Sequence, residues 1–138
     1  MMNELKSKSS QNITSALILI NNNQFSSSIH CSYYACVQLM LHILRADFNK
    51  SEQDITDESQ TGSQDEGGFH NWLINFIRGQ FFLRNNVDCR DFHSFITQLK
   101  GKRIKSDYKN KEIKPNEAKE AYDYAQRIIK LLENNFTV

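Results

Sequence analysis

The chain has 138 residues, which suits a single domain that buries roughly two-thirds of its unfolded surface. Apolar residues make up 39% and charged residues 24%, a balance typical of a globular protein and not of an intrinsically disordered one. The net charge of +1 gives no overall field that would favour nucleic acid or a membrane. We therefore expect one folded domain over residues 1–138.

No stretch of the sequence predicts a membrane span or a secretory signal. The longest apolar runs, such as residues 16–20, are far too short to cross a bilayer. The N-terminal residues lack the basic-then-apolar order of a signal peptide. Three cysteines, an odd number, suit free thiols in a reducing compartment. We expect a cytoplasmic protein that does not enter a membrane.

The first part of the chain has the periodicity of two long helices. The first is predicted over about residues 3–21 and the second over about 24–46. Asparagines at 21–23 separate them, because short amide side chains compete for backbone hydrogen bonds. The second segment is apolar over much of its circumference, which predicts the most buried helix of the fold.

The middle of the chain changes character. Residues 48–68 are rich in aspartate and glutamate and show no apolar period, which predicts an acidic, solvated and mobile loop. Three further helices are expected over about 69–83, 89–109 and 115–134, the last starting at a proline suited to a first helical turn. The chain has one proline and five glycines, and both scarcities favour helices. The predicted fold class is all-α: an up-down antiparallel bundle of four main helices with a shorter fifth.

Three short motifs carry a resemblance to a known family. They are Tyr33-Tyr34-Ala35 in the second helix, Gly68-Phe69-His70 at the start of the third, and Arg103-Ile104-Lys105-Ser106-Asp107-Tyr108 in the fourth. An alanine-spaced last helix follows. In order and spacing these motifs resemble the HEPN family (higher eukaryotes and prokaryotes nucleotide-binding domain), over about residues 10–134.

The resemblance implies a small helical bundle, often a homodimer, that binds nucleotides or RNA. Some HEPN members are metal-independent ribonucleases that act as toxins, often paired with a nucleotidyltransferase-like partner in a toxin–antitoxin system. Those enzymes carry an arginine followed, after four to six residues, by a histidine. The histidine acts on the 2′-hydroxyl or the leaving oxygen, and the arginine stabilises the developing phosphate charge.

This chain departs from the ribonuclease motif. None of its six arginines has a histidine five to seven positions downstream, and at Arg103 the residue in that position is Tyr108. We therefore expect a non-catalytic HEPN-like module that binds nucleotide or RNA phosphates and needs no cofactor. Two alternatives stay open. One is a divergent ribonuclease or toxin that uses His70 or His93 across a dimer. The other is a pure protein–protein module that docks a nucleotidyltransferase-like antitoxin.

The candidate ligand-binding residues are Arg103, Asp107, Tyr108, Tyr34, Lys105 and His70. Arg103 continues an apolar stripe, so its stem is expected to be partly buried, and Asp107 lies one turn away for a charge-assisted pair. This pair suits either of two roles. It forms a network with tyrosine that fixes the fourth helix against the second, or Asp107 orients Arg103 towards a phosphate.

The other candidates also have two interpretations. Tyr33 and Tyr34 point about 100° apart on a helix, so only one can lie at the centre of the core. Tyr34 is expected to hydrogen-bond a neighbour or to stack on a base. His70 is expected to make a hydrogen bond at a helix start, or to carry a proton, because its pKa is near neutrality.

The sequence also contains a basic run and a few residues that could serve as metal ligands. Residues 100–119 hold eight basic side chains against three acidic ones, which indicates either a solvated face or a basic surface for a phosphate backbone. Cys89 and His93 are spaced for one helical face, but there is no Cys-x-x-Cys pair. We expect no metal site.

Overall fold

A computed structural model of the protein describes residues 4–66 and 68–138. They form six helices and no strand: α1 (Glu4–Asn21), α2 (Phe25–Ala46), α3 (Glu52–Glu66), α4 (Phe69–Arg84), α5 (Asn86–Tyr108) and α6 (Pro115–Asn135). The all-α bundle is confirmed. The expected count of four helices and a shorter fifth is wrong, because α3 is an additional helix. The predicted first helical residue, Asn3, lies outside the described residues.

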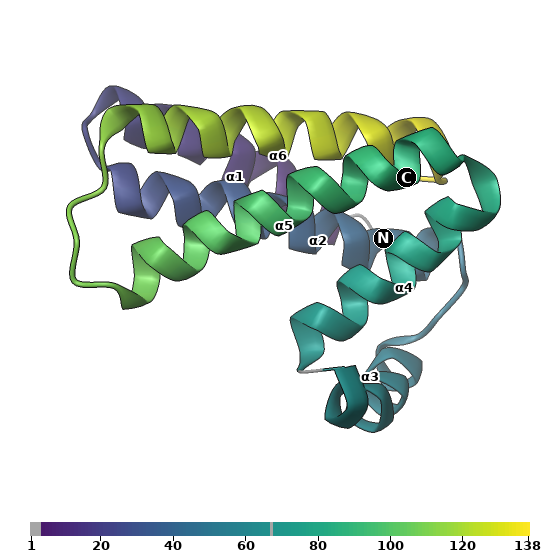
Figure 1. The fold of residues 1–138 in the computed structure, drawn as a ribbon. Coiled ribbons are helices and arrows are strands. Elements are labelled where there is room, and N and C mark those ends of the chain that lie inside the picture. Colours follow the sequence, from purple (N-terminus) through teal and green to yellow (C-terminus); the bar gives the residue numbers. More distant parts are fainter. Residues whose placement is uncertain (1–3, 67) are drawn as a thin grey trace.

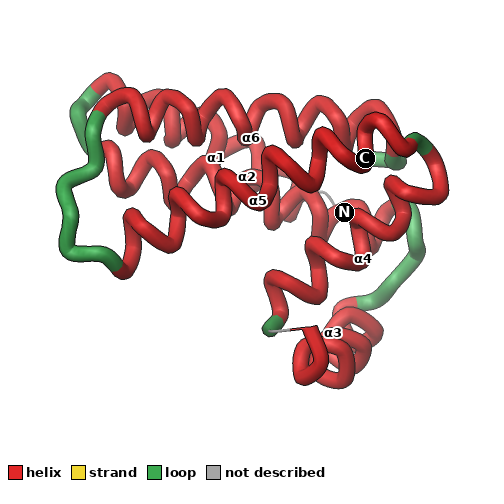
Figure 2. Tube along the Cα trace, viewed as in Figure 1, coloured by secondary structure: helices red, strands yellow, loops and turns green. Residues whose placement is uncertain are grey.

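Four helices lie side by side and two stand apart from them. α1, α2, α5 and α6 form the elongated body, α4 crosses it at an angle, and α3 projects beyond α4 (Figure 1). α2 packs against α1, α4, α5 and α6, which confirms that it is the central helix. Within the described residues, the connections between the helices are short loops and turns (Figure 2).

The core follows from the apolar stripes of α2 and α6. The large side chains Ile29, Tyr33 and Met40 of α2 are buried completely or nearly so. On α6, Ala118, Ala121 and Ala125 are also fully buried, and small side chains of this kind let two helices approach closely. Each buried large apolar side chain stabilises the fold by about 1.5–3 kcal/mol. α2 is therefore a rigid support for any residue that it carries to the surface.

The predicted loop at 48–68 is wrong for residues Glu52–Glu66, which form α3. The Ser51 hydroxyl accepts from the Asp54 amide at 3.0 Å, and the Asp54 carboxylate accepts from the Ser51 amide at 2.9 Å. This reciprocal capping box starts the helix. Ile55 and Ser59 are its buried side chains among those described, so α3 lacks the apolar period by which helices are usually recognised. Gly67 lies outside the described residues.

A single residue joins α4 to α5. The Asn85 side chain accepts from the amides of Val87 and Asp88, both at 3.1 Å, and so caps α5. This helix was expected to start at about residue 89, so α5 begins three residues earlier than expected. The two helices consequently run back along each other from a tight turn.

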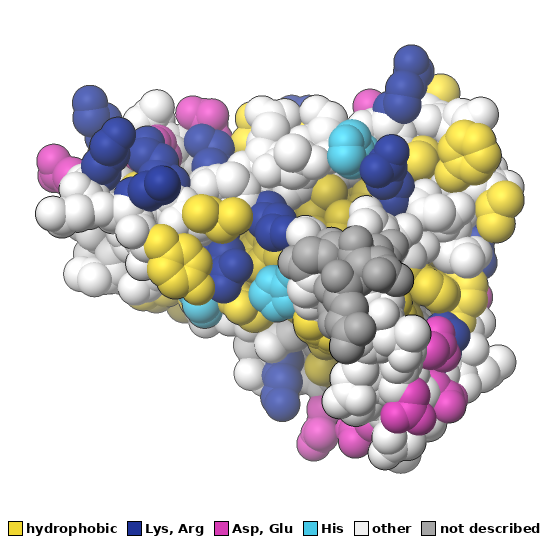
Figure 3. Space-filling view, turned by 60° about the horizontal axis from the view of Figure 1, so that its bottom comes forward, with side chains coloured by type: hydrophobic (Ala, Val, Ile, Leu, Met, Phe, Trp, Pro, Cys, Tyr) yellow, Lys and Arg dark blue, Asp and Glu magenta, His cyan; other side chains and the backbone are white. Residues whose placement is uncertain are grey.

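Charge is unevenly distributed over the surface. Lysine and arginine side chains gather at the end of the molecule that holds the α5–α6 connection, and acidic side chains gather over α3 (Figure 3). None of the helices in the described part of the chain combines the length and the apolar character that crossing a membrane requires.

Candidate functional site

Three helices bring polar and aromatic side chains together on one face of the bundle. We call this group the Arg103 cluster; its members are His30, Tyr33 and Tyr34 of α2, His70 of α4, and Arg103, Asp107 and Tyr108 of α5. Five of the six predicted ligand-binding residues belong to it. Lys105 is the exception. Side chains that are far apart in sequence meet here because α2 packs against both α4 and α5.

Arg103 is the centre of the cluster, and its side chain is 14% exposed. Its Nε lies 3.0 Å from Oδ2 of Asp107, an ion pair whose angle falls outside hydrogen-bond geometry. One Nη donates to the Tyr34 hydroxyl at 3.3 Å. The guanidinium carbon lies 5.2, 5.6 and 5.8 Å from the ring centroids of Tyr33, Tyr34 and Tyr108, within the range of cation–π attraction. The predicted partial burial and the predicted pair with Asp107 are confirmed.

Tyr33, which is fully buried, and His70, which is partly buried, form a hydrogen-bonded pair next to Arg103. The Tyr33 hydroxyl lies 3.0 Å from Nδ1 of His70. Burial raises the pKa of Tyr33, against the opposing effect of the Arg103 charge, so the phenol keeps its proton and can donate it to Nδ1. The pKa of His70 is lowered by burial and then by the charges of Arg103 and Lys100. The neutral imidazole is therefore the favoured form of His70 at neutral pH.

His30 is a member that the sequence analysis did not propose for this site. Its Nδ1 lies 3.5 Å from Oδ2 of Asp107, and its ring centroid lies 4.5 Å from that of Tyr34. The ring of His70 approaches Tyr34 at 5.6 Å, so both imidazoles contact Tyr34. The available signal was spacing, because His30 precedes Tyr34 by four residues and thus shares its helical face.

Lys105 and Lys102 turn away from the cluster. Lys105 forms an ion pair with Glu117 of α6, and Lys102 lies 3.5 Å from Glu120 of the same helix. The hydrogen bond from Lys105 is the largest cause that lowers the pKa of Glu117. Part of the basic run therefore holds α5 against α6, and these two lysines are less available to a phosphate than sequence alone indicated.

Lys100 is a second residue that the sequence analysis did not single out. It is half-buried next to the cluster, and its ammonium donates to the side chain of Asn71 on α4. Burial and the nearby charge of Arg103 lower its pKa. It adds positive charge at the edge of the cluster, one helical turn before Arg103.

The described residues include few side chains that are placed to bind a metal ion. They contain no group of three histidine, cysteine, aspartate or glutamate side chains close enough to hold a metal ion. Cys31, Cys36 and Cys89 are free thiols, and Cys36 and Cys89 are buried. The Arg103 cluster is instead suited to bind an anion, through its guanidinium, and to hold one imidazole neutral beside it.

Comparisons of the chain with protein-family models, with curated proteins and with solved structures found no match. The resemblance to HEPN domains therefore depends on the three sequence motifs. All three meet in the Arg103 cluster: Tyr34 belongs to the first, His70 to the second, and Arg103 to the third.

Proposed function

We propose that the protein is a HEPN-like helical module that binds nucleotide or RNA phosphates at the Arg103 cluster. The observation that carries this proposal is the arginine itself, which contacts one carboxylate and three aromatic rings while its side chain remains 14% exposed. An arginine restrained in this way loses little conformational freedom when an anion binds.

The free donors of Arg103 suit a phosphate. The guanidinium has five N–H groups, and in the described structure its polar contacts go to Asp107 and Tyr34. The remaining donors can bind two phosphate oxygens in a charge-assisted, bidentate arrangement. Lys100 adds positive charge beside them, and Asp107 lowers the net charge of the site. We expect selectivity for phosphate esters over smaller anions.

Tyr108 suits a nucleobase. Its side chain is 71% exposed and lies beside the Arg103 guanidinium, whereas the Tyr34 ring is partly covered by His30, Tyr33 and His70. Stacking of a base on an aromatic side chain contributes about 1–3 kcal/mol per base to the binding of single-stranded nucleic acid. We assign stacking to Tyr108, and the orientation of Arg103 to Tyr34.

Filter binding of a short single-stranded RNA at low and high salt tests this function. We expect binding to weaken steeply with salt, and Tyr108→Ala and Arg103→Lys to weaken it at every salt concentration. Lys105→Ala should have a smaller effect, because its ammonium is engaged by Glu117. Arg127→Ala, which removes an exposed cation on α6, is the matched control. Equal binding by wild type, Tyr108→Ala and Arg103→Lys would rule the proposal out.

The partners implied by the resemblance are part of the same proposal. We expect a homodimer, and a nucleotidyltransferase-like protein as partner, in a toxin–antitoxin arrangement. Mass measurement of the purified protein, with the ratio of absorbance at 260 and 280 nm, separates the cases. A stoichiometric protein partner without RNA favours the interaction module instead.

A second function, metal-independent RNA cleavage, is favoured by one specific observation. The chain lacks the arginine–histidine spacing of the ribonuclease motif. However, the fold brings the rings of His30 and His70 into contact with Tyr34, which lies beside Arg103. In the tautomer whose Nδ1–H donates to the Tyr33 hydroxyl, the neutral imidazole of His70 has a free Nε2 that can act as a general base. His30, whose Nδ1 lies 3.5 Å from Oδ2 of Asp107, supplies the second imidazole that an acid–base pair needs. Such a pair takes a proton from the 2′-hydroxyl and gives one to the leaving 5′-oxygen.

Cleavage and binding are distinguished by replacing the two histidines. If the protein cleaves RNA, His30→Asn and His70→Asn should each remove cleavage of a labelled RNA in a chelator, while binding is kept. If wild type binds RNA and leaves it intact, the binding function stands alone. His93→Asn, at an exposed residue of α5 outside the Arg103 cluster, tests the other histidine that the sequence offered for catalysis. Cleavage that depends on His93 would overturn the assignment to His30 and His70.

A further inference from the structure

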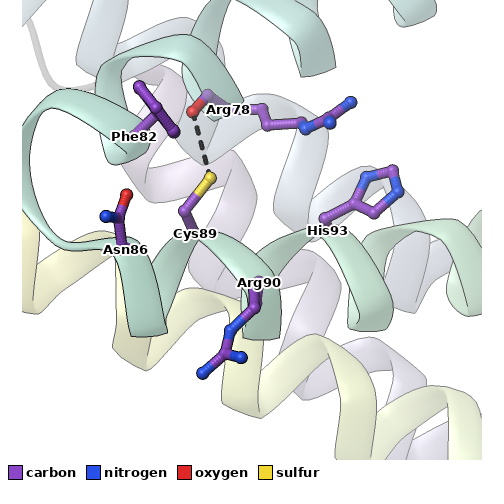
Figure 4. A pocket seen from close by; sticks show the side chains of 6 residues that line it. All are labelled: Arg78, Phe82, Asn86, Cys89, Arg90 and His93. Carbon is purple, nitrogen blue, oxygen red and sulfur yellow. Dashed lines mark hydrogen bonds between the residues drawn. The ribbon is translucent and has the colours of Figure 1, made fainter.

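A second cationic region lies at the other end of α4 and α5, next to the turn that joins them. A hollow of about 410 Å³ is lined by Arg78, Phe82, Asn86, Cys89, Arg90 and His93 (Figure 4). A hollow of about 480 Å³ adjoins it and is lined by Asn75, Arg78, Gly79, Phe82 and Cys89. Because three lining residues are shared, the two form one depression, the α4–α5 groove. Its size is that of a small-molecule site.

The floor of the groove is kept open by its small residues. Cys89 is buried, and its thiol donates to the backbone oxygen of Arg78 at 3.5 Å (Figure 4). At Gly79, an added Cβ would meet no atom within 4 Å. A glycine inside a helix is less favourable than alanine, and here no tight contact requires it. The missing side chain leaves space beside Arg78 and Phe82.

One side of the groove is positively charged and has no neutralising group. Arg78 and His93 extend on the same side of the groove, while Arg90 turns away from them towards α6 (Figure 4). No carboxylate lines either hollow, and Arg78 and His93 have no ion-pair partner in the described part of the chain. The nearby carboxylate of Asp88 accepts from Asn135 of α6 at 2.8 Å. An anion in the groove would therefore meet two unpaired nitrogen-bearing groups.

The other side of the groove is aromatic. Phe82 is 65% exposed, an unusual position for a large apolar ring, and the Asn86 side chain lies beside it (Figure 4). An exposed ring next to a guanidinium and an imidazole offers one surface for stacking and another for an oxyanion.

We propose that the α4–α5 groove binds a small planar organic oxyanion, an aryl phosphate or aryl carboxylate. Its oxyanion lies between Arg78 and His93, and its ring stacks on Phe82. This site is separate from the proposed RNA-binding function, because no residue of the Arg103 cluster lines the groove.

Titration of the full chain with 1-naphthyl phosphate, followed by calorimetry and by NMR shifts of the α4 and α5 amides, tests the proposal. We expect Arg78→Gln to weaken binding about tenfold, since a charge-assisted hydrogen bond is lost. Gly79→Leu fills the open floor and should weaken binding by at least as much. Gly101→Leu, at a glycine of α5 with equally open surroundings, is the matched control and should bind like wild type.

Further variants and ligands distinguish binding in the α4–α5 groove from binding at the Arg103 cluster. In the Arg103→Lys variant, the NMR shifts of the groove amides around Arg78, Phe82 and His93 should still titrate with 1-naphthyl phosphate as in wild type, even where the variant weakens RNA binding at the Arg103 cluster. Inorganic phosphate and 1-naphthol should each bind at least tenfold more weakly than the combined molecule. Wild-type affinity in both Arg78→Gln and Gly79→Leu would overturn the proposal. So would equal affinity for inorganic phosphate, because the ring would then contribute nothing.

Discussion

Arg103 and Arg78 are both surface-facing arginines of neighbouring helices, yet their surroundings differ in almost every respect. The Arg103 side chain is 14% exposed and contacts a carboxylate, a phenol oxygen and three tyrosine rings. Arg78 is exposed and lines an open groove in which no carboxylate takes part. Arg103 is therefore restrained before any ligand binds, whereas the side chain of Arg78 keeps its conformational freedom and its hydration.

The difference indicates two kinds of recognition. At the Arg103 cluster, the cost of removing the guanidinium from water is offset within the fold, so the direction of its free donors is set in advance. In the groove, a ligand must itself restrain Arg78 and displace water. We expect the Arg103 cluster to discriminate between ligands by geometry, and the groove to bind more weakly and less selectively.

The largest expected effect is a difference in how much each arginine contributes to the free energy of unfolding. Arg103→Ala should lower the free energy of unfolding by about 2 kcal/mol, because Asp107 and Tyr34 lose a charged partner and three rings lose a contact. Arg78→Ala should change it by less than about 0.5 kcal/mol, as expected for an exposed residue. Urea denaturation measures both. Equal losses would show that the two surroundings do not differ as described.

The next effect uses one glycine from each region. Gly79 lies in the groove and Gly101 lies two residues before Arg103, and an added Cβ meets no atom within 4 Å at either. Gly79→Ala and Gly101→Ala should each stabilise the fold, by up to about 1 kcal/mol, because alanine is the better helix former. Thermal unfolding tests this. A loss of stability in Gly101→Ala alone would mean that the Arg103 region is more tightly packed than its open surroundings indicate.

A smaller effect concerns α3, which packs against α4, the helix that carries both His70 and Arg78. Ser51→Ala removes half of the capping box and should destabilise α3 by about 0.5–1 kcal/mol. Hydrogen exchange should then quicken in α3 and stay unchanged around His70 and Arg78. Faster exchange throughout α4 would show that the two regions are coupled through it.

The smallest effect is a change in how stability depends on pH. The folded pKa of His70 is lowered, chiefly by burial, so the unfolded chain binds this proton more readily. Its contribution to stability is present above the ordinary value of about 6.5 and is lost as the pH falls below it towards the lowered pKa. His70→Gln should flatten this loss in urea titrations between about pH 7 and 5.5. His42, whose pKa burial also lowers, keeps a slope of the same sign in the variant.

The helices that sequence predicted are those with a clear apolar period. α2, α4 and α6 appear within a residue or two of the expected bounds, since their apolar stripes face the core. α3 was not predicted because it is a polar helix. It starts at the capping box of Ser51 and Asp54, and Ile55 is its buried apolar residue. The early start of α5 was not predicted for a similar reason. The cap at Asn85 consists of local hydrogen bonds, which leave no apolar pattern in the sequence.

The candidate site likewise has features that the sequence predicted and features that it did not. The pair of Arg103 with Asp107 and the division of roles between Tyr33 and Tyr34 follow from positions along one helix, and sequence predicted both. His70 was a candidate because of its motif, but its approach to Tyr34 depends on how α4 packs against α2, and His30 belonged to none of the motifs. The pairing of Lys105 with Glu117 likewise depends on how α5 packs against α6.

Sequence by itself therefore determined the all-helical class, the most buried helix and the charge-paired arginine, because each depends on spacing within a single helix. Only the tertiary structure decided which imidazoles lie beside that arginine, which lysines are engaged elsewhere, and where the α4–α5 groove opens. Those features are set by the packing of helices that are distant along the chain. Packing distances depend on side-chain shape and volume across an interface, which the period of one segment does not contain.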